Sequence, residues 1–353
     1  MIGWIPWNSI AICGFFSVES ELSGQVRQLW ELTGSRDWSA TRTEEPSVST
    51  PSVRPRWEGL PGDVRAEVQA RLGSPVVEVS YPEGGFTPGL AVRLTCADGS
   101  VVFLKAADVT LPMASHYRAE ALVGEHLPSV IAPRLWWSLE SRGWIVNAFE
   151  AVLGGQPDLR PGSADLPGVL DVVGSLEREL TPCPAPVGEA GETLSRLAGH
   201  WERLAAAPAG PDAWSAARGR WLMELDARDL LVKAAVGETL VHCDLRADNM
   251  LMDTGRVRVL DWSWAARGAA WVDAAFFVPQ LILAGHSPAG AEAEVGARVP
   301  AWRAADPKAL SMFAVAITGY WVWHQAHGPG GALGAYRGRA AEAGRRWIDY
   351  RLG

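Results

Sequence analysis

The stretch from residue 240 to residue 266 begins with an apolar pair and then places His242, Asp244, Asn249 and Asp261 at fixed intervals. Between the last two, the sequence MLMDTGRVRVL predicts two short strands joined by a tight turn. A hairpin folds back on itself, so it would bring Asn249 and Asp261 to the same edge, with Asp244 one loop away. Two hard oxygen ligands suit Mg²⁺, which fills the rest of its shell with water and phosphate oxygens. A carboxylate beside that site can orient a nucleophile, so the pattern predicts phosphoryl transfer.

A single lysine stands in an otherwise apolar predicted strand, VVFLKAA, at Lys105. Lysine occurs at only three positions in the chain, whereas Lys and Arg together number 32. Arginine therefore supplies nearly all of the positive surface charge, and a lysine in such a strand indicates a function. An ammonium is a compact point charge with three donors, which suits phosphate binding.

Composition excludes several classes of protein. The net charge is −8 without a long run of one sign, whereas a nucleic-acid-binding protein would carry a basic surface. Four cysteines without metal-ligand spacing favour reduced thiols in a cytoplasmic protein, and we interpret Cys243 as a packing residue. No apolar run is long enough for a membrane span, and the N-terminus lacks the charged start of a secretory signal.

Three regions follow from the pattern along the 353 residues. Residues 1–55 are rich in Pro, Ser and Thr towards their end, and we predict a poorly ordered extension. Residues 56–150 predict five strands with one intervening helix that begins at a Ser115 cap, a small antiparallel α+β unit. Residues 151–353 predict helices, interrupted by the polar loop and hairpin. A nucleotide would bind between two such lobes.

The loop sequence HCDLRADN, followed by an Asp after a hairpin, resembles the catalytic and metal-binding core of kinase-like phosphotransferases. The sequence DWSW at the second Asp and the later block GAAWVDAAFF are more similar to the aminoglycoside phosphotransferase family than to protein kinases. This resemblance covers about residues 75 to 350. It implies a bilobal protein-kinase-like fold of the α+β class, with ATP and Mg²⁺ as cofactors.

The resemblance also implies roles for residues of the sheet lobe. Lys105 would hold the α- and β-phosphates and would need a carboxylate from the next helix, which offers Glu120 and Glu125. The family's Arg-Ala-Glu pattern favours Glu120. A glycine-rich turn would cover the nucleotide, with backbone N–H groups and a threonine hydroxyl near the phosphates; its members are Gly84, Gly85 and Thr87. The hinge would bind adenine through its backbone, with the candidates Phe149, Glu150 and Ala151.

In the larger lobe the resemblance assigns the chemistry to the polar loop. Asp244 would be the catalytic base, Asn249 and Asp261 would bind Mg²⁺, and Asp273 would brace the loop by accepting backbone N–H bonds. Arg246 departs from the family, in which His often occupies this place. Our hypothesis is that Arg246 stabilises the transferring phosphoryl group, the alternative being an ordinary surface arginine.

We therefore expect a cytoplasmic phosphotransferase that moves the γ-phosphate of ATP to a hydroxyl of a small molecule, with no nucleic-acid or membrane partner. Two alternatives stay open: a metabolic kinase for an amino alcohol, sugar or secondary metabolite, and a nucleotide-binding scaffold without activity. Neither the acceptor, the oligomeric state nor the choice of ATP over GTP follows from the residues.

Overall fold

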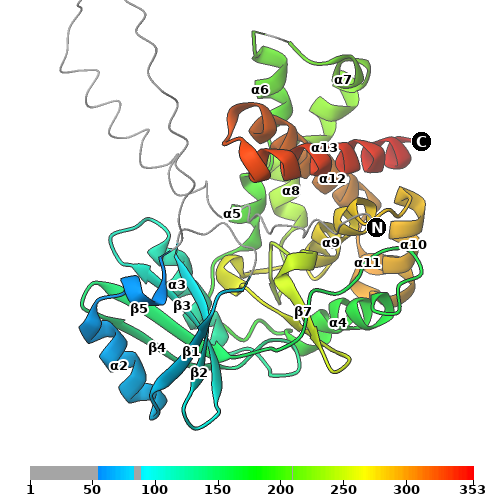
Figure 1. The fold of residues 1–353 in the computed structure, drawn as a ribbon. Helices are drawn as coiled ribbons and strands as arrows, with labels where there is room; N and C mark the ends of the chain where they lie inside the picture. The colour runs from blue at the N-terminus through cyan, green and yellow to red at the C-terminus, as the bar shows by residue number, and fades with distance from the viewer. Residues whose placement is uncertain (1–54, 83–88, 209) are drawn as a thin grey trace, which may run out of the picture.

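The chain forms a sheet lobe and a helical lobe, as expected (Figure 1). The computed structural model describes residues 55–82, 89–208 and 210–353. The predicted extension and the glycine-rich turn, with Gly84, Gly85 and Thr87, therefore lie outside the described residues.

An antiparallel sheet of five strands, in the order β1-β2-β3-β5-β4, makes the smaller lobe. Its strands are β1 (Val76–Ser80), β2 (Leu90–Cys96), β3 (Val101–Asp108), β4 (Leu135–Ser141) and β5 (Trp144–Glu150). Side chains alternate between faces along a strand. Leu94 and Leu104 thus face an apolar core shared with helix α2 (Gly62–Leu72), while Lys105 faces the opposite side.

The pairing of the strands aligns residues on that opposite face. Ala91 pairs with Lys105, and Arg93 pairs with Phe103, which in turn pairs with Phe149 on β5. Two rows of side chains therefore cross the sheet, one at the level of Lys105 and one at the level of Phe103.

Helix α3 (Ala114–Gly124) lies between the sheet and the helical lobe. It buries Tyr117 and Glu120, which come from the face that meets the sheet. The predicted Ser115 cap is wrong: Met113 is the N-cap, and the Ser115 hydroxyl donates to the Pro112 carbonyl at 2.9 Å.

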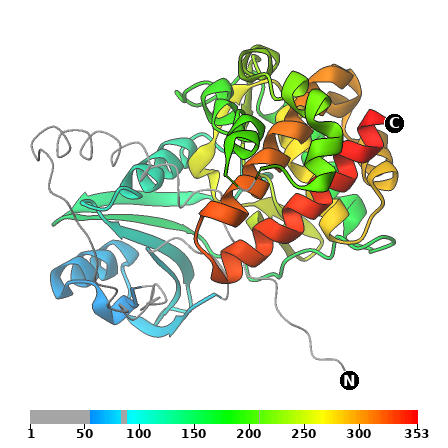
Figure 2. The same ribbon diagram turned by 90° about the horizontal axis from the view of Figure 1, so that it is seen from above.

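The helical lobe contains the remaining helices, and α12 and α13 lie across it in the second view (Figure 2). They are α4 (Leu166–Glu179), α5 (Ala190–Ser195), α6 (His200–Ala206), α7 (Ala213–Leu225), α8 (Arg228–Ala234), α9 (Trp271–Leu283), α10 (Pro288–Arg298), α11 (Pro300–Ala304), α12 (Pro307–His327) and α13 (Gly331–Leu352). No helix among the described residues combines the length and hydropathy of a membrane span.

The apolar spacing of residues 189–206 and of residues 213–236 predicts one long helix in each stretch, but the structure breaks both. The stretch 189–206 divides at Gly199, whose φ of 86° suits glycine, and the stretch 213–236 divides at Asp226. The Asp226 carboxylate accepts the backbone N–H groups of Gly199 and Trp201 at 2.9 and 3.2 Å. The carboxylate at one break therefore stabilises the backbone at the other. This contact is long-range, so local periodicity does not reveal it.

The hairpin after the polar loop forms as predicted, from β7 (Met250–Asp253) and β8 (Arg256–Val259). Its turn residues Thr254 and Gly255 have φ of 48° and 79°, the conformation of the tightest hairpin connections. Strands β6 (Thr239–Val241) and β9 (Ala266–Gly268) pair on either side of the loop and hairpin. This pairing closes the loop at its base, so its polar residues are held from both ends.

Candidate active site

The polar loop after β6 is braced by a buried carboxylate. Asp273, on α9, accepts the backbone N–H groups of His242 and Cys243 at 2.8 and 3.0 Å, as expected. Cys243 has a φ of 61°, which turns the chain sharply. Burial raises the pKa of the Cys243 thiol well above its ordinary value, so this residue is suited to packing rather than to nucleophilic attack.

His242 connects the loop to the end of the hairpin. Its Nδ1 accepts the Asp244 backbone N–H at 3.2 Å, which places the ring proton on Nε2, 2.8 Å from the Leu260 carbonyl oxygen. Burial lowers the pKa of His242 to about 4, so the ring is neutral near pH 7. This neutral tautomer forms both hydrogen bonds, and the bond to the backbone N–H of Asp244 holds this residue in place within the loop.

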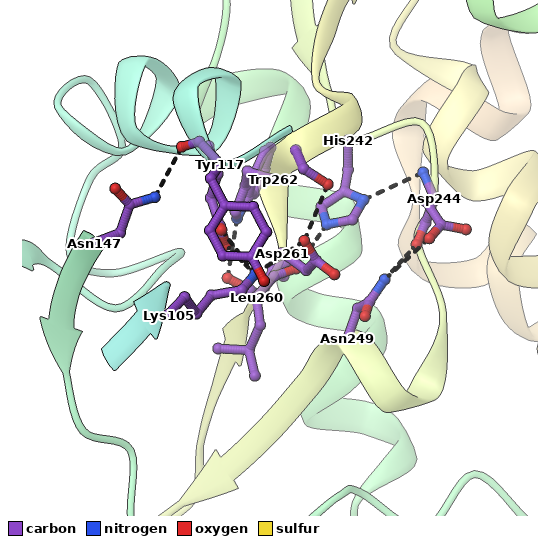
Figure 3. Close-up of polar contacts among 12 residues, drawn as sticks. Lys105, Tyr117, Asn147, His242, Asp244, Asn249, Leu260, Asp261 and Trp262 are labelled. Carbon is purple, nitrogen blue, oxygen red and sulfur yellow. Dashed lines mark hydrogen bonds and ion pairs between the residues drawn. The ribbon is translucent and has the colours of Figure 1, made fainter. Parts of the chain in front are cut away.

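Asn249 lies against Asp244 (Figure 3). Its amide nitrogen donates to the Asp244 carbonyl oxygen at 2.9 Å and approaches the carboxylate oxygen Oδ2 at 3.4 Å. Both side chains are buried. The amide oxygen of Asn249 is thereby left as the atom that can ligate a cation.

Lys105 joins the two lobes through charge. Its Nζ lies 2.7 Å from Glu120 on α3 and 3.2 Å from Asp261, which follows the hairpin of the helical lobe. Glu125, the alternative partner, is exposed. Burial alone would lower the pKa of Lys105, but the adjacent carboxylates of Asp261 and Glu120 raise it above its ordinary value. The ammonium is therefore held charged at the junction of the lobes.

Asp261 occupies a left-handed backbone conformation, with φ of 59°. Burial would raise the pKa of its carboxyl, yet the charge of Lys105 and hydrogen bonds from Lys105 and Ser263 lower it to about 2. Glu120 behaves differently, because burial and the nearby Asp261 charge raise its pKa although Lys105 opposes them. Of the two carboxylates beside Lys105, Asp261 is consequently the one more suited to bind a metal cation.

The donor set fits a magnesium ion. An ionised carboxylate at Asp261 and an amide oxygen at Asn249 both line one cleft, and Mg²⁺ is commonly bound by one or two such groups plus phosphate oxygens. These two residues would hold the ion, which would supply positive charge to the phosphates when bound.

Arg246 is buried, with an exposed fraction of 3%, so the alternative of a surface arginine is wrong. Its Nη2 lies 2.8 Å from Asp248, its Nε lies 3.7 Å from Asp244, and its guanidinium lies 5.9 Å from the centre of the Tyr336 ring. The guanidinium therefore stands beside the expected catalytic base.

One cleft between the lobes collects six of the nine expected residues that the structure describes, whereas Asp244 and Arg246 do not line it. Lys105, Glu120, Asn249 and Asp261 line one end, and Asp248 lies with them. The other end has apolar walls formed by Phe103, Phe149, Val152, Leu251 and Val259. The first end suits phosphates, and the second suits a flat base.

The hinge candidates differ in position. Phe149 and Glu150 line the cleft, whereas Ala151 is not among its lining residues and Val152 is. The backbone N–H of Glu150 already donates to the Arg134 carbonyl at 2.8 Å. The Glu150 carboxylate accepts the Arg134 N–H at 3.2 Å and lies 3.7 Å from Arg258 on the hairpin. Glu150 thus braces the hinge.

Arg93, Phe103 and Tyr117 are among the cleft residues that the sequence reasoning missed. Strand alternation could have found Phe103, which lies two residues before Lys105 and so shares its face. The Tyr117 ring centre is 5.8 Å from Lys105 Nζ. Tyr117 also explains Gly89, the glycine that follows the glycine-rich turn. A Cβ at Gly89 would lie 2.0 Å from the Tyr117 hydroxyl, so there is no room for a side chain.

Comparison with known proteins agrees with this arrangement. Residues 112–310 match the model of the phosphotransferase enzyme family. No curated protein matches the sequence. Among solved structures, an aminoglycoside phosphotransferase from Alicyclobacillus acidocaldarius is 12% identical, with a TM-score of 0.53 and coverage of 78% of this chain and 92% of its own.

Two further structures share the fold. A choline/ethanolamine kinase family protein from Mesorhizobium loti is 16% identical, with a TM-score of 0.52 over 82% of this chain and 98% of its own. A phosphotransferase solved with GDP and kanamycin is 13% identical, with a TM-score of 0.53 over 82% and 98%. At these identities the likeness shows a bilobal kinase-like fold. The match over more than half of its length shows that the chain belongs to the phosphotransferase enzyme family.

Proposed function

We propose that this small-molecule phosphotransferase moves the γ-phosphoryl group of a nucleoside triphosphate to a hydroxyl of a small, polar acceptor, with Mg²⁺ as cofactor. ATP is the donor that the family resemblance implies. The observation that carries the proposal is the contact of Lys105 with Asp261 at 3.2 Å, because it joins the sheet lobe to the element that ends the catalytic loop and hairpin.

The residues divide the reaction among them. Lys105 would bind phosphate oxygens, and Asn249 and Asp261 would hold the cation that neutralises the remaining charge. Asp244 would orient the acceptor hydroxyl and accept its proton as the phosphorus–oxygen bond forms, while the nucleoside diphosphate leaves with the electrons of the broken bond. Asn249 positions Asp244 by donating to it.

Arg246 would support the same step from its position beside Asp244. Its guanidinium is placed by Asp248 and Tyr336 and lies within 4 Å of the base carboxylate. In this role it would hold Asp244 in place and face the developing charge of the phosphoryl group.

The test is transfer of labelled γ-phosphate from ATP and from GTP to a panel of aminoglycosides, amino alcohols and sugars. We expect transfer to at least one acceptor class, dependent on Mg²⁺ and abolished by Asp244→Asn. Transfer to none of them, with nucleotide binding indifferent to Mg²⁺, would favour the inactive scaffold.

A further inference from the structure

The base end of the cleft contains one cationic side chain, Arg93 on β2. It is partly buried and lines the cleft. Its Nη2 donates to the Val152 carbonyl at a long 3.4 Å, and its buried Nε has no hydrogen-bond partner. Within residues 55–82, 89–208 and 210–353 it forms no ion pair. A buried donor without an acceptor is uncommon and costly, so this guanidinium calls for a ligand.

The register of the sheet separates Arg93 from the phosphate end. Lys105 pairs with Ala91, whereas Arg93 pairs with Phe103, one row further along the same face. Two residues of strand span roughly 6.6 Å. With the phosphates at Lys105, the row of Arg93 and Phe103 lies at the distance of the base. The position of Arg93 in the sheet therefore assigns its guanidinium to the base end of the cleft.

The surroundings sharpen the choice of base. Phe103 and Phe149 form an apolar wall on the sheet side, and Leu251 and Val259 form one on the hairpin side. Such walls accept any flat purine. Discrimination between adenine and guanine must therefore come from protein groups that contact the polar edge of the purine. Arg93 can offer only hydrogen-bond donors to that edge.

The two purines present different edges to a donor. Guanine carries two adjacent acceptors, O6 and N7, which a guanidinium can bind with two parallel hydrogen bonds. Adenine places an amino group where guanine has O6, so a guanidinium would face another donor. We infer that Arg93 is a specificity-determining residue that gives this cleft a preference for guanine over adenine nucleotides. The inference rests on the proposed function and replaces ATP with GTP as the better donor.

The test measures dissociation constants of GDP and ADP, each with Mg²⁺, for the full-length protein by titration calorimetry. We expect GDP to bind roughly tenfold more tightly, the scale of one bidentate arginine–guanine contact. Arg93→Met keeps the apolar stem but removes the donors, so GDP should weaken to the level of ADP while ADP changes little.

Two further variants separate specificity from charge and from stability. Arg93→Lys keeps the charge but loses the planar fork, so it should also lose most of the preference. Arg118→Met is a matched control, because Arg118 is exposed on α3 and pairs with Glu140 outside the cleft; it should keep the wild-type ratio. If Arg93→Met does not fold, the ratio in Arg93→Lys decides.

Equal affinities for GDP and ADP in the wild type would overturn the inference, and so would a ratio unchanged in Arg93→Met and Arg93→Lys. If the Arg93 variants bound GDP and ADP more weakly by the same factor, Arg93 would only support the hinge through Val152 and would not recognise the base. Each of these outcomes leaves phosphoryl transfer intact. Failure to bind either nucleotide would instead contradict the proposed function itself.

Discussion

The two ends of the interlobe cleft use opposite means of holding a ligand. At the phosphate end, Lys105, Glu120 and Asp261 come from three separate segments, and the ammonium lies 2.7 Å from Glu120 and 3.2 Å from Asp261. At the base end, the walls are apolar and Arg93 is the cation there among the described lining residues. One end is a balanced cluster of charges, and the other is an apolar slot with one guanidinium.

This difference has a physical reason. Charges buried together must balance, so removing one leaves the others uncompensated and costly. An apolar slot instead gains affinity from area and stacking, in small increments that single substitutions can remove. We therefore expect large effects confined to phosphorylated ligands at the phosphate end, and smaller effects shared by nucleoside and nucleotide at the base end.

The largest effect should follow Asp244→Asn. Loss of a general base typically costs two to four orders of magnitude, so we expect kcat to fall roughly 10³-fold. Nucleotide affinity should change less than threefold or so, because Asp244 lies behind Asn249 and does not line the nucleotide cleft. Steady-state kinetics and calorimetry would check both values. Retention of full transferase activity would remove Asp244 from the mechanism.

Lys105→Met tests the phosphate end alone. We expect kcat/KM to fall about 100-fold, since the variant leaves Glu120 and Asp261 facing each other without a cation. Binding of the unphosphorylated nucleoside should stay the same. Lys233→Met, at an exposed position on α8, is the matched control. An equal loss of nucleoside and nucleotide binding would contradict the division of the cleft into two ends.

Acid should lower the stability of the folded protein through His242, which lies in the polar loop. Its pKa is about 4 when folded, against about 6.5 in an unfolded chain. Between these values the unfolded chain binds more protons, so stability is complete above about pH 6.5 and is lost as the pH falls towards 4.

The span of this pKa shift corresponds to about 3 kcal/mol. His242→Gln cannot take up the proton, so its unfolding free energy should depend less on pH across that window, measured by urea unfolding. The exposed His126→Gln is the control and should keep the wild-type slope. A slope identical in His242→Gln and the wild type would show that the ring is not kept neutral by burial.

The smallest effect is expected at the base end, for Phe103→Ala. Stacking of a base on an aromatic ring contributes about 1–3 kcal/mol, so affinity should fall roughly tenfold. The loss should be the same for nucleoside and nucleotide, because Phe103 lies one row away from Lys105. A loss confined to nucleotides would place Phe103 at the phosphates and would break the comparison.

Much of the phosphate end was predictable because its chemistry restricts residue type and spacing. The loop HCDLRADN, the hairpin and Lys105 each follow from local pattern, and the structure brings Lys105, Asn249 and Asp261 into one cleft. The two unbroken helices failed because the breaks depend on the contact of Asp226 with Gly199, 27 residues away. The Ser115 cap failed because the helix begins one residue earlier, at Ala114, and the Ser115 hydroxyl donates to the Pro112 carbonyl instead.

The sequence by itself determined the family, the bilobal fold and the kind of reaction, because a lysine in an apolar strand and an H-x-D-x-x-x-x-N loop admit few other uses. The tertiary structure alone decided which carboxylate meets Lys105, that Arg246 is buried beside Asp244, and that Arg93 stands at the base end. The first and the last depend on helix packing and strand register, which bring residues far apart in the chain together. The burial of Arg246 depends on packing against distant elements such as α13, whose Tyr336 ring lies near its guanidinium.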